Sequence, residues 1–111
     1  MPYKPKVLVD FDGPIHKYSR GWLDGTAYDG PTEGSKEALE AMEEVGFDVV
    51  IFSSRDAEQI REWLALYGYK PYRVTNVKEP ALCQIDDRAI RWINWDQSIN
   101  DLSILHPIKE S

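Results

Sequence analysis

The residues best suited to chemistry are two aspartates, Asp10 and Asp12, which directly follow the apolar run of residues 7–9. Three branched aliphatic residues in a row predict a buried strand, and alternation along a strand places both carboxylates on the same side of the chain. Gly13 and Pro14 then end the strand and turn the backbone. Two negative charges this close together are unfavourable unless a cation or a reaction uses them. We therefore expect a functional site where this strand ends.

Polar side chains also follow the other apolar runs of the chain, each where a strand is expected to end. They are Ser53 and Ser54 after residues 48–52, Lys78, and Asp86 and Asp87 after residues 82–85. Ligands of parallel sheets bind beyond the carboxyl ends of the strands, so we expect these groups to meet in one crevice. Carboxylates without a His or Cys cluster are hard oxygen donors, which favour Mg²⁺ over zinc. A hydroxyl, a lysine and free backbone amides beside such a metal suit a phosphoryl group.

The elements that must position these groups alternate between apolar runs and amphipathic stretches, a pattern typical of α/β proteins. Strands are expected at residues 6–10, 48–52, 72–75 and 82–85, with a last short strand at 90–93. Helices are expected at 32–45, after a capping box of Asp56 and Gln59, and after a cap formed by Asn94 and Gln97. Right-handed crossovers make such a sheet mostly parallel and place helices on both faces. The sequence thus predicts a three-layer, Rossmann-like fold.

Length and composition predict a single domain over residues 1–111, with a flap at about residues 13–31. The net charge of −6 disfavours a broad nucleic-acid-binding face but leaves room for a small basic patch. No apolar run is long enough to span a bilayer and the N-terminus does not resemble a signal peptide, so we expect a cytoplasmic protein without a membrane partner. The single cysteine, Cys83, indicates a reducing compartment and is expected to be a buried core thiol.

Taken together, these residues resemble the four motifs of the haloacid dehalogenase superfamily, over residues 6–93. The motifs are Asp10-x-Asp12-Gly13, Ser53 at a strand end, Lys78, and Asp86-Asp87. The resemblance implies that Asp10 is a nucleophile that forms an aspartyl-phosphate and that Asp12 is the general acid and base. The dehalogenase branch lacks the second aspartate, so Asp12 indicates phosphoryl transfer.

The resemblance also implies how substrate and metal are held. Ser53 and Lys78 are expected to hold the phosphoryl group, with Lys70 as the rival lysine. Mg²⁺ is expected on Asp10, on the backbone carbonyl of Asp12 and on Asp86, with Asp87 as a direct or an outer ligand. The remaining expected substrate-binding residues are Gly13, Ser54 and Arg55. Ser54 also suits the cap of the next helix, and Arg55 suits a local salt bridge.

Two departures from the family pattern concern the flap. Many members have Thr or Val after Asp-Gly, whereas this chain has Pro14-Ile15. Only 40 residues separate Asp12 from Ser53, which leaves room for a flap and one helix but not for a cap domain. The chain therefore resembles the capless branch. We expect such an open site to be closed by a large substrate or by a second subunit of a homo-oligomer.

The expected activity is Mg²⁺-dependent hydrolysis of a small phosphomonoester, such as a nucleotide or a sugar phosphate. An alternative substrate is the phosphorylated end of a nucleic acid, because the Asp86-Asp87-Arg88 run is similar to the phosphatase domains of polynucleotide kinases. Flap aromatics interleaved with basic residues also suit base stacking; they are Tyr18, Trp22 and Tyr28, with Lys17 and Arg20. His16 is expected at the flap surface. An alternative from another class is a non-catalytic phosphate-binding or receiver-like signalling module.

Overall fold

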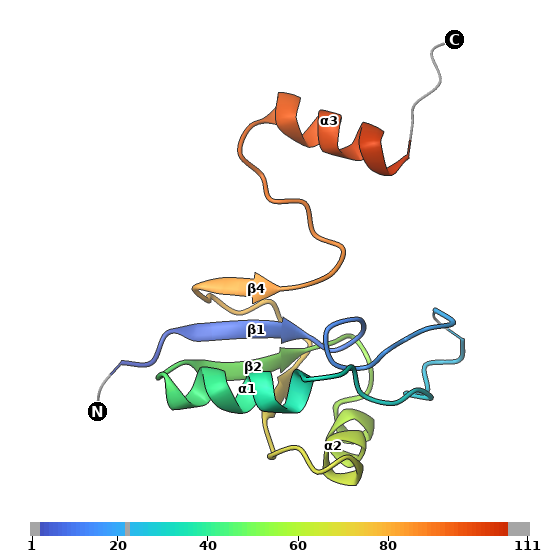
Figure 1. Ribbon diagram of the computed structural model, residues 1–111, viewed down its shortest axis with the longest axis vertical. Helices are drawn as coiled ribbons and strands as arrows, with labels where there is room; N and C mark the ends of the chain where they lie inside the picture. Colours follow the sequence, from blue (N-terminus) through green and yellow to red (C-terminus); the bar gives the residue numbers. More distant parts are fainter. Residues whose placement is uncertain (1–2, 22, 107–111) are drawn as a thin grey trace.

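The computed structural model describes residues 3–21 and 23–106, and within them four strands form one all-parallel sheet in the order β3-β2-β1-β4. Helices and strands alternate along most of the chain (Figure 1). The elements are β1 (Lys6–Asp10), α1 (Ser35–Glu44), β2 (Asp48–Phe52), α2 (Ala57–Leu66), β3 (Arg73–Thr75), β4 (Cys83–Ile85) and α3 (Trp95–Leu105). The predicted α/β class and parallel sheet are confirmed.

One face of the sheet holds the hydrophobic core. Val7 and Val9 of β1 and Ile51 of β2 pack there with Leu39 of α1 and Trp63 of α2. The chain steps in one direction, from β1 to β2 to β3. Two crossovers of the same hand then place both helices on one face, and parallel crossovers are nearly always right-handed. This packing fixes β1 and β2 side by side and in register, so Asp10 lies opposite Phe52 at the carboxyl edge of the sheet.

The opposite face is covered by a connection that contains no helix. The segment 76–82 leads from one edge strand, β3, to the other, β4, and its Glu79 binds Lys6 of β1 at 2.7 Å and Arg73 of β3 at 2.6 Å. Leu8 of β1, which alternates with the core residues Val7 and Val9, is 1% exposed on this face. The prediction of helices on both faces is therefore wrong, because this crossover is too short to form one.

The last helix, α3, stands apart from the sheet and packs against none of the other described strands or helices (Figure 1). Its predicted cap is confirmed, since the Asn94 side chain accepts a hydrogen bond from the Gln97 amide at 2.8 Å. The strand expected at 90–93 is absent from the described chain, where these residues form an extended connection. The apolar residues Ile99 and Leu102 are more than half exposed because no element covers them.

The residues that cap α2 also contact the flap. The predicted cap of α2 is confirmed for Asp56, which accepts from the Gln59 amide at 3.3 Å, whereas the Gln59 side chain accepts from the Ala27 amide at 2.9 Å. Asp56 and Gln59 thus connect the flap to α2.

The predicted core position of Cys83 is wrong. Cys83 is exposed, because it lies on the edge strand β4. No helix among the described residues is long and apolar enough to cross a membrane.

Candidate functional site

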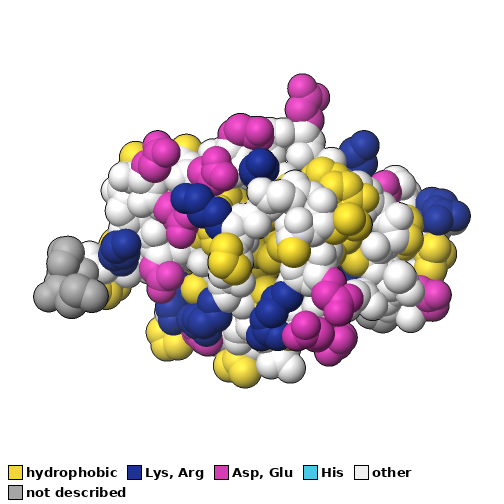
Figure 2. Space-filling model, turned by 90° about the horizontal axis from the view of Figure 1, so that it is seen from below, with side chains coloured by type: hydrophobic (Ala, Val, Ile, Leu, Met, Phe, Trp, Pro, Cys, Tyr) yellow, Lys and Arg dark blue, Asp and Glu magenta, His cyan; other side chains and the backbone are white. Residues whose placement is uncertain are grey.

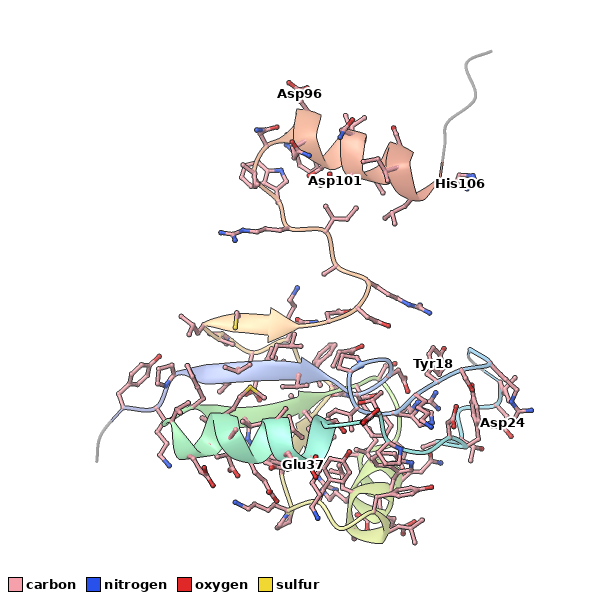
Figure 3. The ribbon with its side chains drawn as sticks, viewed as in Figure 1. Tyr18, Asp24, Glu37, Asp96, Asp101 and His106 are labelled. Atoms are coloured by element: carbon pink, nitrogen blue, oxygen red, sulfur yellow. The ribbon has the colours of Figure 1, made fainter. Side chains whose placement is uncertain are left out.

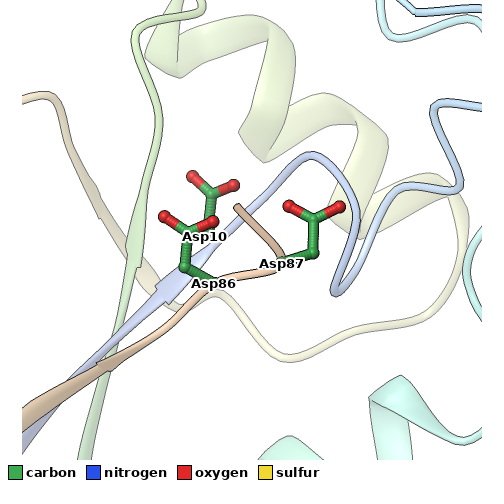
Figure 4. A group of neighbouring side chains, drawn as sticks. All are labelled: Asp10, Asp86 and Asp87. Carbon is green, nitrogen blue, oxygen red and sulfur yellow. The ribbon is translucent and has the colours of Figure 1, made fainter. Parts of the chain in front are cut away.

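Three carboxylates meet at the carboxyl edge of the sheet. Asp10 ends β1, and Asp86 and Asp87 follow β4, which pairs with β1 so that Val9 lies opposite Ile85. Each of the three aspartates offers an oxygen within 4.8 Å of the other two (Figure 4). We call Asp10, Asp86 and Asp87 the carboxylate trio. The parallel pairing of β1 and β4 brings together residues that are 76 positions apart in the sequence.

The trio concentrates negative charge in a partly buried place. The pKa of Asp10 is raised to about 7, first by burial and then by the charges of Asp86, Asp12 and Asp87, in that order. The guanidinium of Arg88 acts in the opposite direction on the Asp10 pKa but does not cancel it. Like charges that raise a neighbour's pKa are relieved by a bound cation. The arrangement is therefore suited to a divalent metal ion.

Gly13 lets the turn after β1 lie directly against the trio. Its φ angle is +100°, a conformation that favours glycine, and a Cβ atom at this position would overlap with the Asp87 carboxylate. The Gly13 amide donates to the His16 carbonyl oxygen at 2.8 Å, so this amide is directed into the turn. The glycine thus permits a close approach between the first and last acidic motifs.

Asp12 is held separately from the trio by a histidine and an arginine. His16 Nδ1 lies 2.8 Å from Asp12 Oδ1, and Arg55 Nε donates to both carboxylate oxygens at 3.1 and 3.0 Å. The Asp12 side chain is 20% exposed, whereas the side chains of His16 and Arg55 are 0% and 1% exposed. We call His16 and Arg55 the Asp12 clamp. Arg55, expected to bind substrate or form a local salt bridge, here pairs with Asp12.

The expectation that His16 lies on the flap surface is wrong, because the residue is completely buried. Its ring stacks on Phe11 at 5.2 Å between centroids and meets Tyr28 and Trp63 edge-on at 5.4 and 5.9 Å. The flap has no amphipathic period that could reveal such burial. The one available signal in the sequence is the spacing of His16, four residues after Asp12.

The Ser-Ser-Arg turn after β2 forms one wall of a polar pocket. Ser53 is buried, and its Oγ accepts from the Arg55 amide at 3.1 Å. The pocket has a volume of about 410 Å³, and Ser54, Thr75 and Asn76 also line it. Ser54 was a candidate cap of α2, but Asp56 caps that helix. The pocket lies where β2 and β3 end, and Arg55, whose Nε pairs with Asp12, is one of its lining residues.

The two candidate lysines lie on different parts of the chain. Lys70 precedes β3, at the amino edge of the sheet, and its Nζ lies 3.4 Å from a Glu43 oxygen. Lys78 is exposed in the 76–82 connection and forms no hydrogen bond or ion pair with other described residues. The cation that acts on the Asp10 pKa is Arg88, which directly follows Asp86 and Asp87.

The flap aromatics contact cations and the buried histidine. The Arg20 guanidinium lies 4.8 Å from the Tyr28 ring, and those of Arg55 and Arg88 lie 5.5 and 5.7 Å from the Tyr18 ring. Tyr18, labelled in Figure 3, thus links the flap to both sides of the site. Trp22 lies outside the described residues. The described flap rings therefore pack against arginines and a histidine of the protein itself.

Comparisons of the chain with protein-family models, with curated proteins and with solved structures found no match. The residues of the site are three carboxylates that repel one another and a fourth in a separate clamp, and Arg55 of that clamp also lines the polar pocket.

Proposed function

We propose that the chain is an Mg²⁺-dependent phosphohydrolase of the haloacid dehalogenase type, which hydrolyses phosphomonoesters through an aspartyl-phosphate on Asp10. The main support is the carboxylate trio, which gathers acidic residues from both ends of the sequence at the edge of the sheet where ligands bind. A protein that folds with this repulsion gains stability when a cation binds. The separate holding of Asp12 supports a second, different task for that carboxylate.

The donor set fits Mg²⁺. All three side chains offer carboxylate oxygens, the ligands that this hard cation prefers. Mg²⁺ binds oxygens at about 2.1 Å, so opposite ligands lie about 4 Å apart. The oxygens of the trio are at most 4.8 Å apart, and small side-chain movements close the difference. When bound, the cation would neutralise the trio and stabilise negative charge on the phosphoryl oxygens.

The proposed reaction has two steps. In the first, an Asp10 oxygen attacks phosphorus, the ester P–O bond breaks, and the leaving oxygen takes a proton from the Asp12 carboxyl group. In the second, Asp12 removes a proton from water as the water oxygen attacks phosphorus. The bond between phosphorus and Asp10 then breaks, and inorganic phosphate leaves. The Ser53 hydroxyl, which lines the polar pocket, would donate to a phosphoryl oxygen.

A small phosphomonoester fits this site better than a nucleic-acid end. The described flap rings, Tyr18 and Tyr28, are already in contact with arginines and with His16, so they are not free to stack on bases. On the face shown in Figure 2, the described Lys and Arg side chains are interspersed with Asp and Glu side chains. A long polyanion needs a continuous basic surface.

The test is hydrolysis of a panel of phosphomonoesters by purified protein, with Mg²⁺ or with a chelator. We expect turnover that depends on Mg²⁺ and is lost in Asp10→Asn but retained in Asp96→Asn. Asp96 is a matched control because it lies on α3, far from the sheet (Figure 3). Turnover that survives full chelation would contradict the metal assignment. Stable phosphorylation without release of phosphate would favour a receiver-like module.

A further inference from the structure

We propose that His16 is a positioning residue that orients Asp12 for proton transfer, an inference that rests on the proposed function. The two side chains are joined by the 2.8 Å contact between His16 Nδ1 and Asp12 Oδ1. His16 does not belong to the carboxylate trio, and its completely buried ring cannot contact substrate. It therefore acts on the reaction through Asp12.

The hydrogen bonds of His16 fix which nitrogen carries the proton. The Asp29 backbone amide donates to His16 Nε2 at 2.9 Å, so Nε2 is an acceptor and carries no proton. The proton is then on Nδ1, and Nδ1–H donates to Asp12. This is the usual way in which one hydrogen bond of an imidazole sets the function of its other nitrogen.

His16 is held rigidly because Asp29, whose amide donates to His16 Nε2, is itself held by several hydrogen bonds. Trp63 Nε1, from α2, donates to the Asp29 carbonyl oxygen at 2.9 Å. The Asp29 carboxylate accepts from the hydroxyl and the amide of Ser19, and these hydrogen bonds, with one from the Gly30 amide, lower the pKa of Asp29 to about 2. The Phe11 ring covers one face of the imidazole. Asp12 is thus connected through His16 to the core helix α2.

The two carboxylate oxygens of Asp12 accept different hydrogen bonds from the Asp12 clamp. Oδ1 accepts from His16 Nδ1 and from Arg55 Nε, whereas Oδ2 accepts only the shared Arg55 Nε–H among the described contacts. Oδ2 is therefore the oxygen with room for the transferred proton. A fixed Oδ1 reduces rotation of the carboxyl group and keeps Oδ2 in one direction. The contribution of His16 is this orientation.

Kinetics with two leaving groups separate positioning from general structural damage. An alkyl phosphate needs a proton on its leaving oxygen, whereas 4-nitrophenolate leaves without one. We expect His16→Phe, which keeps a ring against Phe11, to lower kcat by about tenfold or more on the alkyl phosphate and little on 4-nitrophenyl phosphate. His16→Asn keeps an amide donor near the position of Nδ1 and should recover most of the loss. Equal losses on both substrates, or no loss on either, would overturn the proposal.

NMR tests the same pairing without any substrate. The chain has two histidines, and the exposed His106 serves as an internal control. We expect ¹⁵N spectra to show the proton of His16 on Nδ1, protected from exchange, and to show faster exchange in Asp12→Ala. A proton on Nε2, or unchanged protection in Asp12→Ala, would overturn the proposal. If no phosphomonoester is hydrolysed, the proposed function fails, and these spectra still decide whether His16 holds Asp12.

Discussion

Two carboxylates that are two residues apart in the sequence, Asp10 and Asp12, have opposite surroundings in the structure. Asp10 faces two other carboxylates, and burial with their repulsion raises its pKa to about 7. Asp12 faces a buried arginine and a buried histidine, both of which donate hydrogen bonds to it. A bound cation would relieve the repulsion around Asp10, whereas Asp12 already pairs with the cationic Arg55. One turn of the chain thus gives identical side chains two different properties.

The origin of the difference is the turn itself. Asp10 ends β1 and is carried by the sheet beside the residues that follow β4. Asp12 belongs to the turn, where a bridge between Asp12 and His16 brings the flap back against it. The sheet therefore assembles the carboxylate trio and the flap assembles the Asp12 clamp. Substitutions at the two aspartates should have clearly different consequences.

The largest expected difference is in activity. Asp10→Asn should lower turnover by about a thousandfold or more on every substrate, because an amide is a poor nucleophile. Asp12→Asn should cost about 10²–10⁴-fold on alkyl phosphates and much less on 4-nitrophenyl phosphate. Steady-state kinetics with both substrates measure this, with Asp96→Asn as the control. If Asp12→Asn were inactive and Asp10→Asn remained active, the roles of nucleophile and general acid would have to be exchanged.

The second difference is in the sign of the effect on stability. Without metal at pH 8, Asp10→Asn should increase the free energy of unfolding, because it removes one of several repelling charges. Asp12→Asn should lower it by about 2–3 kcal/mol, because charged hydrogen bonds to the buried Arg55 are weakened. Urea unfolding in the presence of a chelator measures both. Equal changes of the same sign would show that the two sites do not differ as described.

The third prediction concerns pH. The folded protein keeps Asp10 protonated up to about pH 7, whereas the unfolded chain loses this proton near pH 4. Protonation of Asp10 therefore favours the folded state in this window, and its contribution falls as pH rises from 4 to 7, by at most about 4 kcal/mol. Thermal unfolding with a chelator should show this loss in the wild type and a smaller one in Asp10→Asn. Added Mg²⁺ should restore stability above pH 7.

The smallest expected effect is at Gly13, between the two aspartates. Gly13→Ala requires an unfavourable φ of +100° and places a methyl group where the Asp87 carboxylate lies. The backbone strain alone costs about 1–2 kcal/mol. Displacement of Asp87 should also weaken Mg²⁺ binding, measured by calorimetry. Gly34→Ala is the control, because Gly34 also has a positive φ, +81°, but no atom near the position of an added Cβ. Equal metal affinity in the two variants would show that Asp87 does not help to bind the metal.

The parts of the fold predicted from the sequence are those with strong local signals. The apolar runs at β1 and β2 and the caps at Asp56 and Asn94 are recognisable because each depends on residues close together in the chain. The strand-end aspartates Asp10 and Asp86 are likewise predictable, since parallel pairing brings strand ends together. Local pattern and topology were enough for the carboxylate trio.

The features that were missed depend on contacts between distant segments. His16 is buried by Phe11 and Trp63, and the irregular flap sequence has no periodic pattern that predicts these contacts. Cys83 has the pattern of a core strand, but its strand lies at the sheet edge and leaves it exposed. The helices cover one face only because β4 pairs with β1 at the edge opposite β3, through a connection too short to form a helix. The local pattern does not encode this strand order.

The most direct test of the account is chemical trapping of the intermediate on Asp10. Borohydride reduces an acyl phosphate to an alcohol and would convert a phosphorylated aspartate into homoserine, which peptide mass mapping locates. With substrate and Mg²⁺ present, the account predicts homoserine at position 10, none at position 12, and none at either position with a chelator. Homoserine at position 12, or turnover that leaves both aspartates unmodified, would contradict it.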